Sequence, residues 1–413
     1  MDRCFFITYR TFQGEVGGGR GVIYRLFLAN RKYNLFPNSY YCFTDTCLSS
    51  TDNPPVHQGS VEKGDNSGTR FSSIKKFLRR IGLYHILRHQ IYVKAVRQFL
   101  ESLNDKYHFD STDCFVFHDI ESSGEFVKLY HFTNTVLVYH QQGNLYYEQT
   151  AMGMPESVSY HKYLNKYVAN TMNRTEKVCF PSIGAKECFF SSDSEMEKLV
   201  SKKEFDILYN GFAKPDALPP SQDETVNTTL NTIDALKGLK LITVANLNEA
   251  KGVERIPTLL GELKKKMDFK WILIGNGAKR EEVDNEIHRA EIEDNTIWIK
   301  NSIAHNDILR LFEKTDVYIL MHRFSIFDYA TLEAMAYYNI PILSDVGGNR
   351  EVIIDNNGLL VTDVTDAQQI INYLMTADIE KTKEKNAEVY EKHFNDKVFL
   401  AGYEKEIGLL TRN

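Results

Sequence analysis

Lys251 and Glu333 are the two residues whose types and places in the sequence best fit binding of a sugar diphosphate. Lys251 lies in residues 244–252, which follow an apolar run and lead into a helical pattern. Ligands of parallel sheets bind beyond the carboxyl ends of the strands, so a cation in such a loop can neutralise a diphosphate. Glu333 lies within the apolar residues 332–336, and a carboxylate this close to a core needs a partner, which ribose hydroxyls would provide. Taken singly, each residue also fits a solvent-exposed position.

Glycine turns and a helix start accompany these two residues. Gly275-Asn276-Gly277 ends one apolar run, and a double-glycine turn within residues 345–349 follows another. Glycine lets another group approach the backbone closely. Residues 324–336 become helical at about Asp328, and the N-terminus of a helix offers free amides to phosphates or sugar hydroxyls. The candidate donor-binding residues here are Asn246, Gly275, Ser325, Ile326, Phe327 and Asp328.

A glycine-rich loop, residues 14–21, follows the first apolar run of the chain. Gly18, Gly19 and Arg20 lie where this loop passes into a helical pattern. Because amides at such a helix start favour anions, we expect this loop to meet the donor phosphates.

Two histidines end apolar runs in the same half of the chain. His118 is followed by Asp119, and His140 follows residues 135–139. A lone histidine is more often structural, but a place at the carboxyl edge of a sheet favours a role near a ligand. We expect His118 and Asp119 on the acceptor side, and His140 to orient or stabilise charge rather than act as a nucleophile.

Short apolar runs alternate with longer helical patterns along the whole chain, which is typical of βαβ units and parallel sheets. The runs are residues 4–7, 40–43, 114–117, 135–139, 177–180, 240–244, 270–274, 296–299, 317–320, 340–343 and 358–361. A chain of 413 residues is too long for one ordinary core, so two domains are expected. The predicted fold is α/β, with two Rossmann-like, doubly wound domains that face a central cleft.

The predicted domain boundary lies just before a polar, proline-containing segment, residues 214–229, which has the composition of a linker. Residues 1–212 then form the acceptor-side domain, and residues 213–386 the donor-binding domain. A C-terminal helix at about 387–413 is expected to cross back onto the first domain. Residues 49–73 are polar and rich in turn formers, and we expect a surface loop there.

Composition excludes several classes of protein. The net charge of −6 gives no sign of a nucleic-acid binder. The six cysteines are scattered and show neither a zinc spacing nor a dense disulfide pattern, which fits a reducing cytosol. Neither an export signal nor a membrane-spanning segment is expected from the sequence. We therefore expect a cytoplasmic protein whose membrane contact, if any, is peripheral.

Residues 74–100 combine seven lysines and arginines with interleaved apolar residues and contain no acid. A basic amphipathic helix of this kind can lie on an anionic membrane surface, such as the inner face of the cell membrane. The same residues also fit a solvated helix that packs on its own domain. The sequence leaves both interpretations open.

The segments around Lys251, Gly275 and Glu333, together with residues 345–349, resemble the donor-binding half of glycosyltransferase family 4. These are retaining transferases of the GT-B fold, and the resemblance is strong over residues 239–361. It implies that Lys251 neutralises the donor diphosphate in place of a metal, that Glu333 holds the ribose hydroxyls, and that no cofactor is needed. It also places His140 near the reacting sugar and Ile303 at the nucleotide base.

The activity that this resemblance implies is a metal-independent hexosyl or N-acetylhexosaminyl transfer with retention of configuration. The expected donor is a nucleotide sugar, most simply a UDP-sugar. The expected acceptor is a glycan, a lipid-linked sugar or a glycoprotein, as in the synthesis of cell-surface polysaccharide. Two departures concern the donor site, because the family usually has arginine where this chain has Asn246 and glutamate where it has Ser325.

The sequence leaves two alternatives to the transferase. A catalytically silent GT-B subunit that stabilises a partner enzyme is favoured by Asn246 and Ser325, whereas Lys251 and Glu333 favour activity. A dinucleotide-dependent enzyme lacks its complete glycine fingerprint here. No paired carboxylates typical of glycoside hydrolases are visible.

Overall fold

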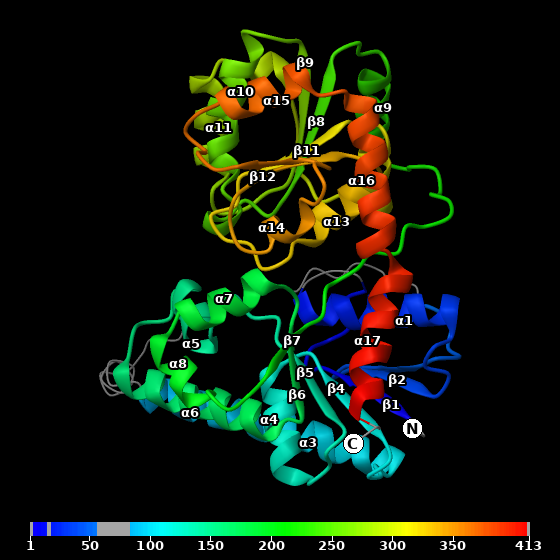
Figure 1. The fold of residues 1–413 in the computed structure, drawn as a ribbon, viewed down its shortest axis with the longest axis vertical. Helices are drawn as coiled ribbons and strands as arrows, with labels where there is room; N and C mark the ends of the chain where they lie inside the picture. Colours follow the sequence, from blue (N-terminus) through cyan, green and yellow to red (C-terminus); the bar gives the residue numbers. More distant parts are fainter. Residues whose placement is uncertain (1–2, 15–17, 56–82, 411–413) are drawn as a thin grey trace. The chain divides into compact units, whose positions relative to one another are not determined.

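The computed structural model describes residues 3–14, 18–55 and 83–410. The chain divides into two compact units. Unit 1 comprises Met1–Tyr209 and Phe399–Asn413, and unit 2 comprises Asn210–Val398. Each unit is an α/β domain built around a mainly parallel sheet, as the alternation of apolar runs and helical patterns predicted (Figure 1).

Unit 1 contains a seven-stranded sheet with the order β3-β2-β1-β4-β5-β6-β7. All neighbouring strands are parallel except β3, which runs antiparallel to β2. The strands are β1 (Cys4–Ile7), β2 (Ser39–Cys42), β3 (Cys47–Ser49), β4 (Cys114–Phe117), β5 (Thr135–Val138), β6 (Lys177–Phe180) and β7 (Phe205–Ile207). The helices are α1 (Gly18–Tyr33), α3 (Leu83–Tyr107), α4 (Ile120–Leu129), α5 (Leu145–Ala151), α6 (Val158–Arg174), α7 (Ile183–Ser191), α8 (Ser194–Leu199) and α17 (Asp396–Leu410).

Aromatic side chains fill the core of unit 1. Phe5 of β1 stacks on Phe115 of β4 with 5.5 Å between ring centroids, and Phe6 stacks on Tyr41 of β2 at 4.9 Å. These pairs face one another because the strands align Phe5 with Phe115 and Phe6 with Tyr41. The three central strands are therefore held in register by their own side chains.

Unit 2 contains a six-stranded, all-parallel sheet with the order β10-β9-β8-β11-β12-β13. The strands are β8 (Leu239–Val244), β9 (Phe269–Ile274), β10 (Thr296–Ile299), β11 (Val317–Leu320), β12 (Ile340–Ser344) and β13 (Leu359–Val361). The α-helices are α9 (Glu224–Asp234), α10 (Ile256–Lys264), α11 (Arg280–Arg289), α12 (His305–Glu313), α13 (Tyr329–Ala336), α14 (Asn349–Val352), α15 (Gln368–Thr376) and α16 (Ile379–His393). Three short 3-10 helices are η1 (Glu249–Lys251), η2 (Val253–Arg255) and η3 (Glu293–Asn295).

Both sheets have the strand order of a doubly wound fold. In unit 1 the order reverses between β1 and β4, and in unit 2 it reverses between β8 and β11. The loops that follow two such strands diverge, which leaves a crevice at the carboxyl edge of the sheet. A ligand site is therefore expected at the residues just after β1, β4, β8 and β11.

The structure differs from the sequence prediction at two segments. The second part of the expected linker, residues 224–229, belongs to α9, because Asp223 caps that helix and Val226 and Thr229 are buried on one of its faces. Residues 387–393 belong to α16 in unit 2, where the Tyr390 hydroxyl donates a hydrogen bond to the Phe212 carbonyl at 2.7 Å. Only the following helix, α17, packs on unit 1, with Tyr403 against Phe6.

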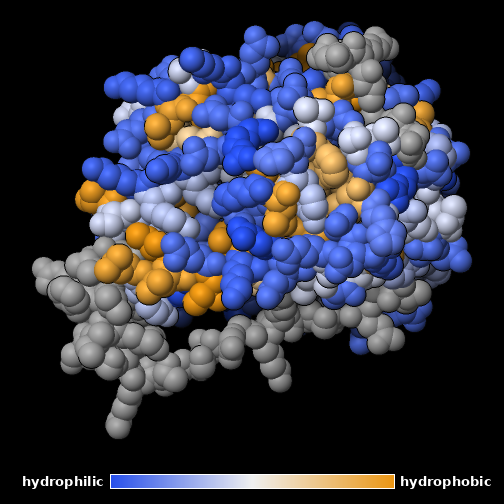
Figure 2. Space-filling view, turned by 90° about the horizontal axis from the view of Figure 1, so that it is seen from below, coloured by the Kyte–Doolittle hydropathy of each residue, from blue (hydrophilic) through white to orange (hydrophobic). Residues whose placement is uncertain are grey.

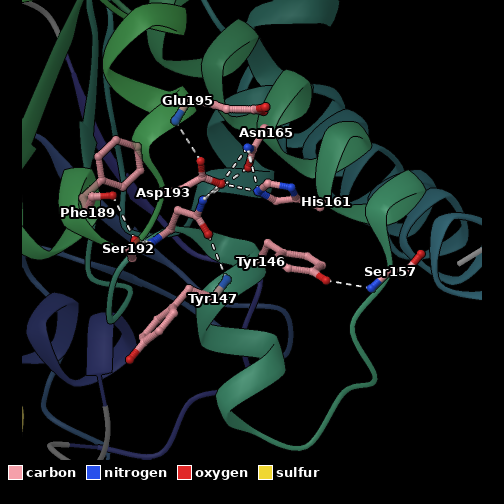
Figure 3. A network of polar contacts seen from close by, with 10 residues as sticks. Tyr146, Tyr147, Ser157, His161, Asn165, Phe189, Ser192, Asp193 and Glu195 are labelled. Carbon is pink, nitrogen blue, oxygen red and sulfur yellow. Dashed lines mark hydrogen bonds and ion pairs between the residues drawn. The ribbon is translucent and has the colours of Figure 1, made fainter.

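A polar network holds α5, α6 and α8 together in unit 1 (Figure 3). Asp193 caps α8 and accepts hydrogen bonds from the Glu195 amide at 2.9 Å, from Asn144 at 2.9 Å and from Asn165 at 2.7 Å. The His161 ring also contacts this carboxylate, and these side chains point toward one another in Figure 3. Because Asn144 caps α5, the network fixes where that helix begins after β5.

Candidate functional site

Four loops at the carboxyl edge of the unit 2 sheet are joined by close backbone approaches. A Cβ on Gly275 would lie 1.9 Å from the carbonyl oxygen of Ala245, so only glycine fits between the loops after β8 and β9. Gly252 has φ +59°, and a Cβ there would lie 2.0 Å from the Met321 carbonyl oxygen in the loop after β11. A Cβ on Gly347 would likewise lie 2.1 Å from the Ser325 carbonyl oxygen. The glycine turns therefore hold the four loops together as one surface.

Lys251 and Asp328 meet at the point where the strand order of unit 2 reverses. Lys251 ends η1 after β8, and Asp328 precedes α13 after β11. The Lys251 Nζ atom lies 2.6 Å from Asp328 Oδ1, and the two side chains are 23% and 15% exposed. The pair is thus partly buried but reachable, and an anion can approach the ammonium group from solvent.

The Asp328 carboxylate is stabilised in its charged form. Burial alone would raise its pKa, but the Lys251 ammonium and the His322 ring lower the pKa of Asp328 well below its ordinary value. The His322 Nε2 atom lies 3.5 Å from Asp328 Oδ2, and the Tyr318 hydroxyl donates to the same oxygen at 3.4 Å. Burial lowers the pKa of His322 despite this neighbour, so the ring is neutral at neutral pH. The net charge of the Lys251–Asp328–His322 group is therefore zero.

Glu333 lies on α13 and is buried. Its Oε1 atom lies 3.1 Å from His305 Nε2, at the start of α12. Burial and the carboxylates of Asp328 and Glu333 all raise the pKa of Tyr318, so both acids lie around this one phenol. His305 and His322 are not among the residues predicted from the sequence, although His322 follows β11 closely.

The other candidate donor-binding residues of unit 2 have different surroundings. Asn246 is exposed beside Gly277, and Ile303 is half-buried in the loop before α12. Phe327 is buried against Phe394, with 5.7 Å between ring centroids. Ile326, next to it, is half-buried. Ser325 is buried, and its hydroxyl has no hydrogen-bond partner among the described residues.

In unit 1, the start of α1 lies directly against two histidines. A Cβ on Gly19 would lie 2.6 Å from the His118 carbonyl oxygen and 3.1 Å from His140 Cδ2. The His118 Nδ1 and His140 Nε2 atoms are 3.1 Å apart, so one ring donates a hydrogen bond to the other. Gly18 and Arg20 are neighbours of Gly19 in the first turn of α1, and Arg20 forms no ion pair within the described part of the chain.

Asp119 has a structural role at the start of α4. Its Oδ1 atom accepts a hydrogen bond from the Ser122 amide at 2.7 Å. Its Oδ2 atom accepts from the Tyr9 amide at 2.8 Å and from the Ser122 hydroxyl at 2.9 Å. These bonds occupy both oxygens and join the ends of β1 and β4.

We expect the histidine pair to make the stability of the protein depend on pH. Burial lowers the pKa of His140 to about 4, and burial followed by the neighbouring ring lowers the pKa of His118 well below its ordinary value. Between about pH 4 and 6.5 the unfolded chain binds protons that the folded chain does not. We therefore expect the free energy of unfolding to fall as the pH drops from 6.5 to 5, by at most about 1.4 kcal/mol per pH unit for each histidine.

Urea unfolding at pH 7, 6 and 5 measures how the free energy of unfolding depends on pH. The wild type is compared with His140→Gln, and His131→Gln, which replaces an exposed histidine, is the matched control. The slope should decrease in His140→Gln and persist in His131→Gln. Equal slopes in all three proteins would show that the histidine pair does not cause the effect.

Comparison with known proteins connects unit 2 with sugar transfer. Residues 234–402 match the family "Glycosyl transferases group 1". This match covers the loops after β8, β9, β11 and β12 that build the candidate site. No curated protein sequence matches the chain.

Several solved structures have a similar fold. Sucrose-phosphate synthase from Thermosynechococcus elongatus superimposes with a TM-score of 0.66 and 15% identity over 100% of both chains. Anabaena HepE, in complex with UDP and glucose, gives a TM-score of 0.59 and 14% identity over 99% of both chains. The lipopolysaccharide outer core galactosyltransferase WaaB gives a TM-score of 0.59 and 17% identity over 98% of this chain and 99% of that one.

These similarities confirm the fold that the sequence predicted, because they cover almost the whole chain. Since the identities are low, the similarities concern the fold alone. The family match adds a specific statement for the second half. Residues 234–402 match the group 1 glycosyl transferases, in a chain with the GT-B fold.

Proposed function

We propose that the protein is a retaining glycosyltransferase that uses a nucleotide-diphosphate sugar, most simply a UDP-sugar. The observation that carries this proposal is the Lys251–Asp328 pair at the strand reversal of unit 2, surrounded by glycine turns. A partly buried, reachable ammonium group beside glycine turns is suited to bind a diphosphate. The family match of residues 234–402 and the UDP-bound state of a protein with a similar fold support the choice of donor.

In this proposal each residue has a defined task in holding the donor. Lys251 neutralises the diphosphate, so no divalent cation is needed for this purpose. Glu333 accepts hydrogen bonds from the ribose hydroxyls. The unpartnered Ser325 hydroxyl is available to the sugar, and His140, neutral at pH 7, supplies a hydrogen bond near the reacting carbon.

The reaction exchanges one bond at the anomeric carbon for another. The bond from this carbon to the diphosphate oxygen breaks, and a bond to the acceptor oxygen forms on the same face. The acceptor hydroxyl loses its proton to an oxygen of the leaving diphosphate. Lys251 stabilises the negative charge that develops on this diphosphate, which is where such a group contributes most to the rate. A glycan or lipid-linked sugar is the proposed acceptor, as the similar fold of a lipopolysaccharide galactosyltransferase suggests.

The experiment that tests the proposal is a panel of nucleotide sugars in EDTA with the full-length chain. UDP-sugars are expected to raise the melting temperature, because a ligand that binds only the folded state stabilises it. Slow hydrolysis of the best donor should release the sugar with its original anomeric configuration, as NMR would show. If no nucleotide sugar stabilises the chain, the silent-subunit interpretation, which Asn246 and Ser325 favoured, replaces this one.

The Asp328 carboxylate should compete with the donor diphosphate for Lys251. Replacing Asp328 with asparagine keeps the shape of the side chain and frees the ammonium group. We expect Asp328→Asn to bind UDP about three- to tenfold more tightly than the wild type. Calorimetric titration measures the change, with Asp307→Asn on α12 as the control. Weaker binding of UDP by Asp328→Asn would mean that the carboxylate orients Lys251 for the donor.

We also propose that α3 contacts an anionic membrane surface through the first part of its length. Leu83, Leu87 and Ile91 are 44%, 52% and 70% exposed and follow one another at the spacing of a single helix face. Arg88 and Lys94 are exposed beside them, while Val96 and other apolar residues of the second part are buried. Figure 2, which views this end of unit 1, shows apolar residues gathered among hydrophilic ones. Residues 74–82 of the basic segment lie outside the described residues.

No helix among the described residues is long and apolar enough to cross a membrane. Flotation with vesicles of equal parts phosphatidylserine and phosphatidylcholine tests the α3 contact. We expect at least about tenfold weaker binding of Leu87→Ser/Ile91→Ser, because each side chain contributes over 1 kcal/mol when it enters the lipid surface. Met375→Ser, exposed on α15, is the control. The proposal would be contradicted if Leu87→Ser/Ile91→Ser bound the vesicles as well as Met375→Ser does. It would also be contradicted if the wild type bound vesicles of pure phosphatidylcholine equally well.

A further inference from the structure

A cavity of about 640 Å³ lies in unit 1, on residues that the donor site does not use. This volume is in the range of small-molecule sites. Its lining combines two arginines, a buried acid, an amide and two tyrosines, namely Arg10, Arg88, Glu121, Gln149, Tyr92 and Tyr160. A lining of this kind offers charges, hydrogen bonds and flat apolar faces together.

The cavity lies at the strand reversal of unit 1. Arg10 comes shortly after β1, and Glu121 is on the first turn of α4, shortly after β4. Gln149 belongs to α5, which follows β5. Residues that follow the three neighbouring strands β1, β4 and β5 thus line this cavity. It lies at the edge where doubly wound sheets bind ligands.

Glu121 is the buried acid of the cavity lining. The residue is 4% exposed, and its Oε2 atom has no hydrogen-bond partner among the described residues. Burial, and then the Asp119 carboxylate, raise the pKa of Glu121 to about 7. A buried carboxyl oxygen without a partner is costly to the fold. A sugar hydroxyl that donates to this oxygen would remove the cost.

The two arginines supply positive charge at the open side of the same cavity. Both side chains are exposed, and within the described ranges neither forms an ion pair with a carboxylate. The guanidinium carbon of Arg10 lies 6.0 Å from the centroid of the Tyr92 ring. Guanidinium groups are well suited to bind phosphate or carboxylate with two parallel hydrogen bonds.

The aromatic and amide groups complete a site for a sugar ring. The Tyr160 hydroxyl donates to Gln149 Oε1 at 2.8 Å, which fixes the amide in the cavity lining. Tyr92 is half-buried, and its aromatic ring lines the same cavity. Sugars carry both apolar C–H faces and hydroxyls, so this combination fits them.

We propose that this cavity binds the acceptor, and that the acceptor is a sugar with an anionic group, a phosphate or a carboxylate. Arg10 and Arg88 bind the anionic group, and Glu121 accepts a hydrogen bond from a ring hydroxyl. The inference rests on the proposed transferase function, because it names the substrate class of the second site. The cavity and its unpartnered acid are independent of the donor residues in unit 2.

The test is a calorimetric titration of the full-length chain with glucose 6-phosphate, glucuronate and glucose as probes. We expect at least one of the two anionic sugars to bind about tenfold or more tightly than glucose, and the stronger of the two identifies the anionic group. Arg10→Ala and Arg88→Ala should each weaken that binding about tenfold. The control is Arg174→Ala, an exposed arginine at the end of α6. Because the replaced arginines are exposed, these variants should keep the melting temperature of the wild type.

Glu121→Gln is measured in the same series. This substitution should weaken the binding of all three sugars by a similar factor, because all three carry ring hydroxyls. Equal binding of glucose and both anionic sugars, or unchanged binding in the Arg10 and Arg88 variants, would overturn the proposal.

UDP binding, measured on the same samples, separates the two hypotheses. Loss of sugar binding with intact UDP binding would contradict only the acceptor site. Intact sugar binding without UDP binding would contradict only the donor site.

Discussion

Lys251→Ala is expected to lower the rate of donor hydrolysis and transfer by about 10²- to 10³-fold, the usual loss when one group that stabilises the leaving charge is removed. The reason is the place of Lys251 at the strand reversal, where its side chain is 23% exposed and its ammonium group is held by Asp328. The effect should appear mainly in kcat, because charge on the diphosphate grows as the bond to the sugar breaks. The rate is measured as the release of UDP from a UDP-sugar, which a coupled assay detects.

Two controls make the Lys251 result specific. Lys265→Ala removes an exposed lysine of the same unit, at the end of α10, and should retain full activity. Lys251→Arg keeps the charge and should retain part of the rate. If Lys251→Ala hydrolyses the donor as fast as Lys265→Ala, the diphosphate binds elsewhere.

Glu333→Ala should raise the KM for the nucleotide sugar about 10- to 100-fold, with a smaller change in kcat. Hydrogen bonds to a charged group contribute about 1.5–3 kcal/mol, and the ribose hydroxyls take no part in the chemistry. Glu333 is 6% exposed, so water replaces a lost partner poorly. Steady-state kinetics at varied donor concentration separates the two constants.

The matched control for Glu333 is Glu313→Ala, an exposed glutamate at the end of α12. A deoxyribose form of the donor offers a second check, since it should lose affinity for the wild type but not for Glu333→Ala. A loss of kcat with unchanged KM in Glu333→Ala would place the carboxylate at the reacting sugar and not at the ribose.

The sequence predicted the strands that are buried and apolar but missed two at the ends of one sheet. β1 and β4 are continuous buried runs, so their pattern is unmistakable. β7 has three residues, all half-buried, and β3 is a short antiparallel partner of β2. Such short pieces become strands only because a neighbour offers hydrogen bonds, and the sequence of the piece does not show that.

The glycine turns of the donor region were predictable because each has a steric cause, as Gly252 and Gly275 show. The partners of the polar side chains were not. Asp328 meets Lys251 only because β8 and β11 are neighbours in the sheet. The sequences of these two segments do not predict that the strands pair. His305 meets Glu333 through the packing of α12 on α13 for the same reason.

The acceptor cavity shows a further limit of sequence reasoning. Asp119 and Glu121 both follow β4, and the sequence favoured Asp119 as a site residue. The structure starts α4 at Ile120, which makes Asp119 the helix cap and leaves Glu121 to line the cavity. Which of two nearby acids faces a ligand thus depends on where the helix begins, within a single residue.

The central claim is that Lys251 and Glu333 hold one nucleoside diphosphate. The most direct measurement is a titration of UDP into the full-length wild type, Lys251→Ala and Glu333→Ala in the presence of EDTA. We expect one UDP to bind per wild-type chain, and both variants to bind UDP at least about tenfold more weakly. Equal affinity in all three proteins, or no binding of UDP by the wild type, would contradict it.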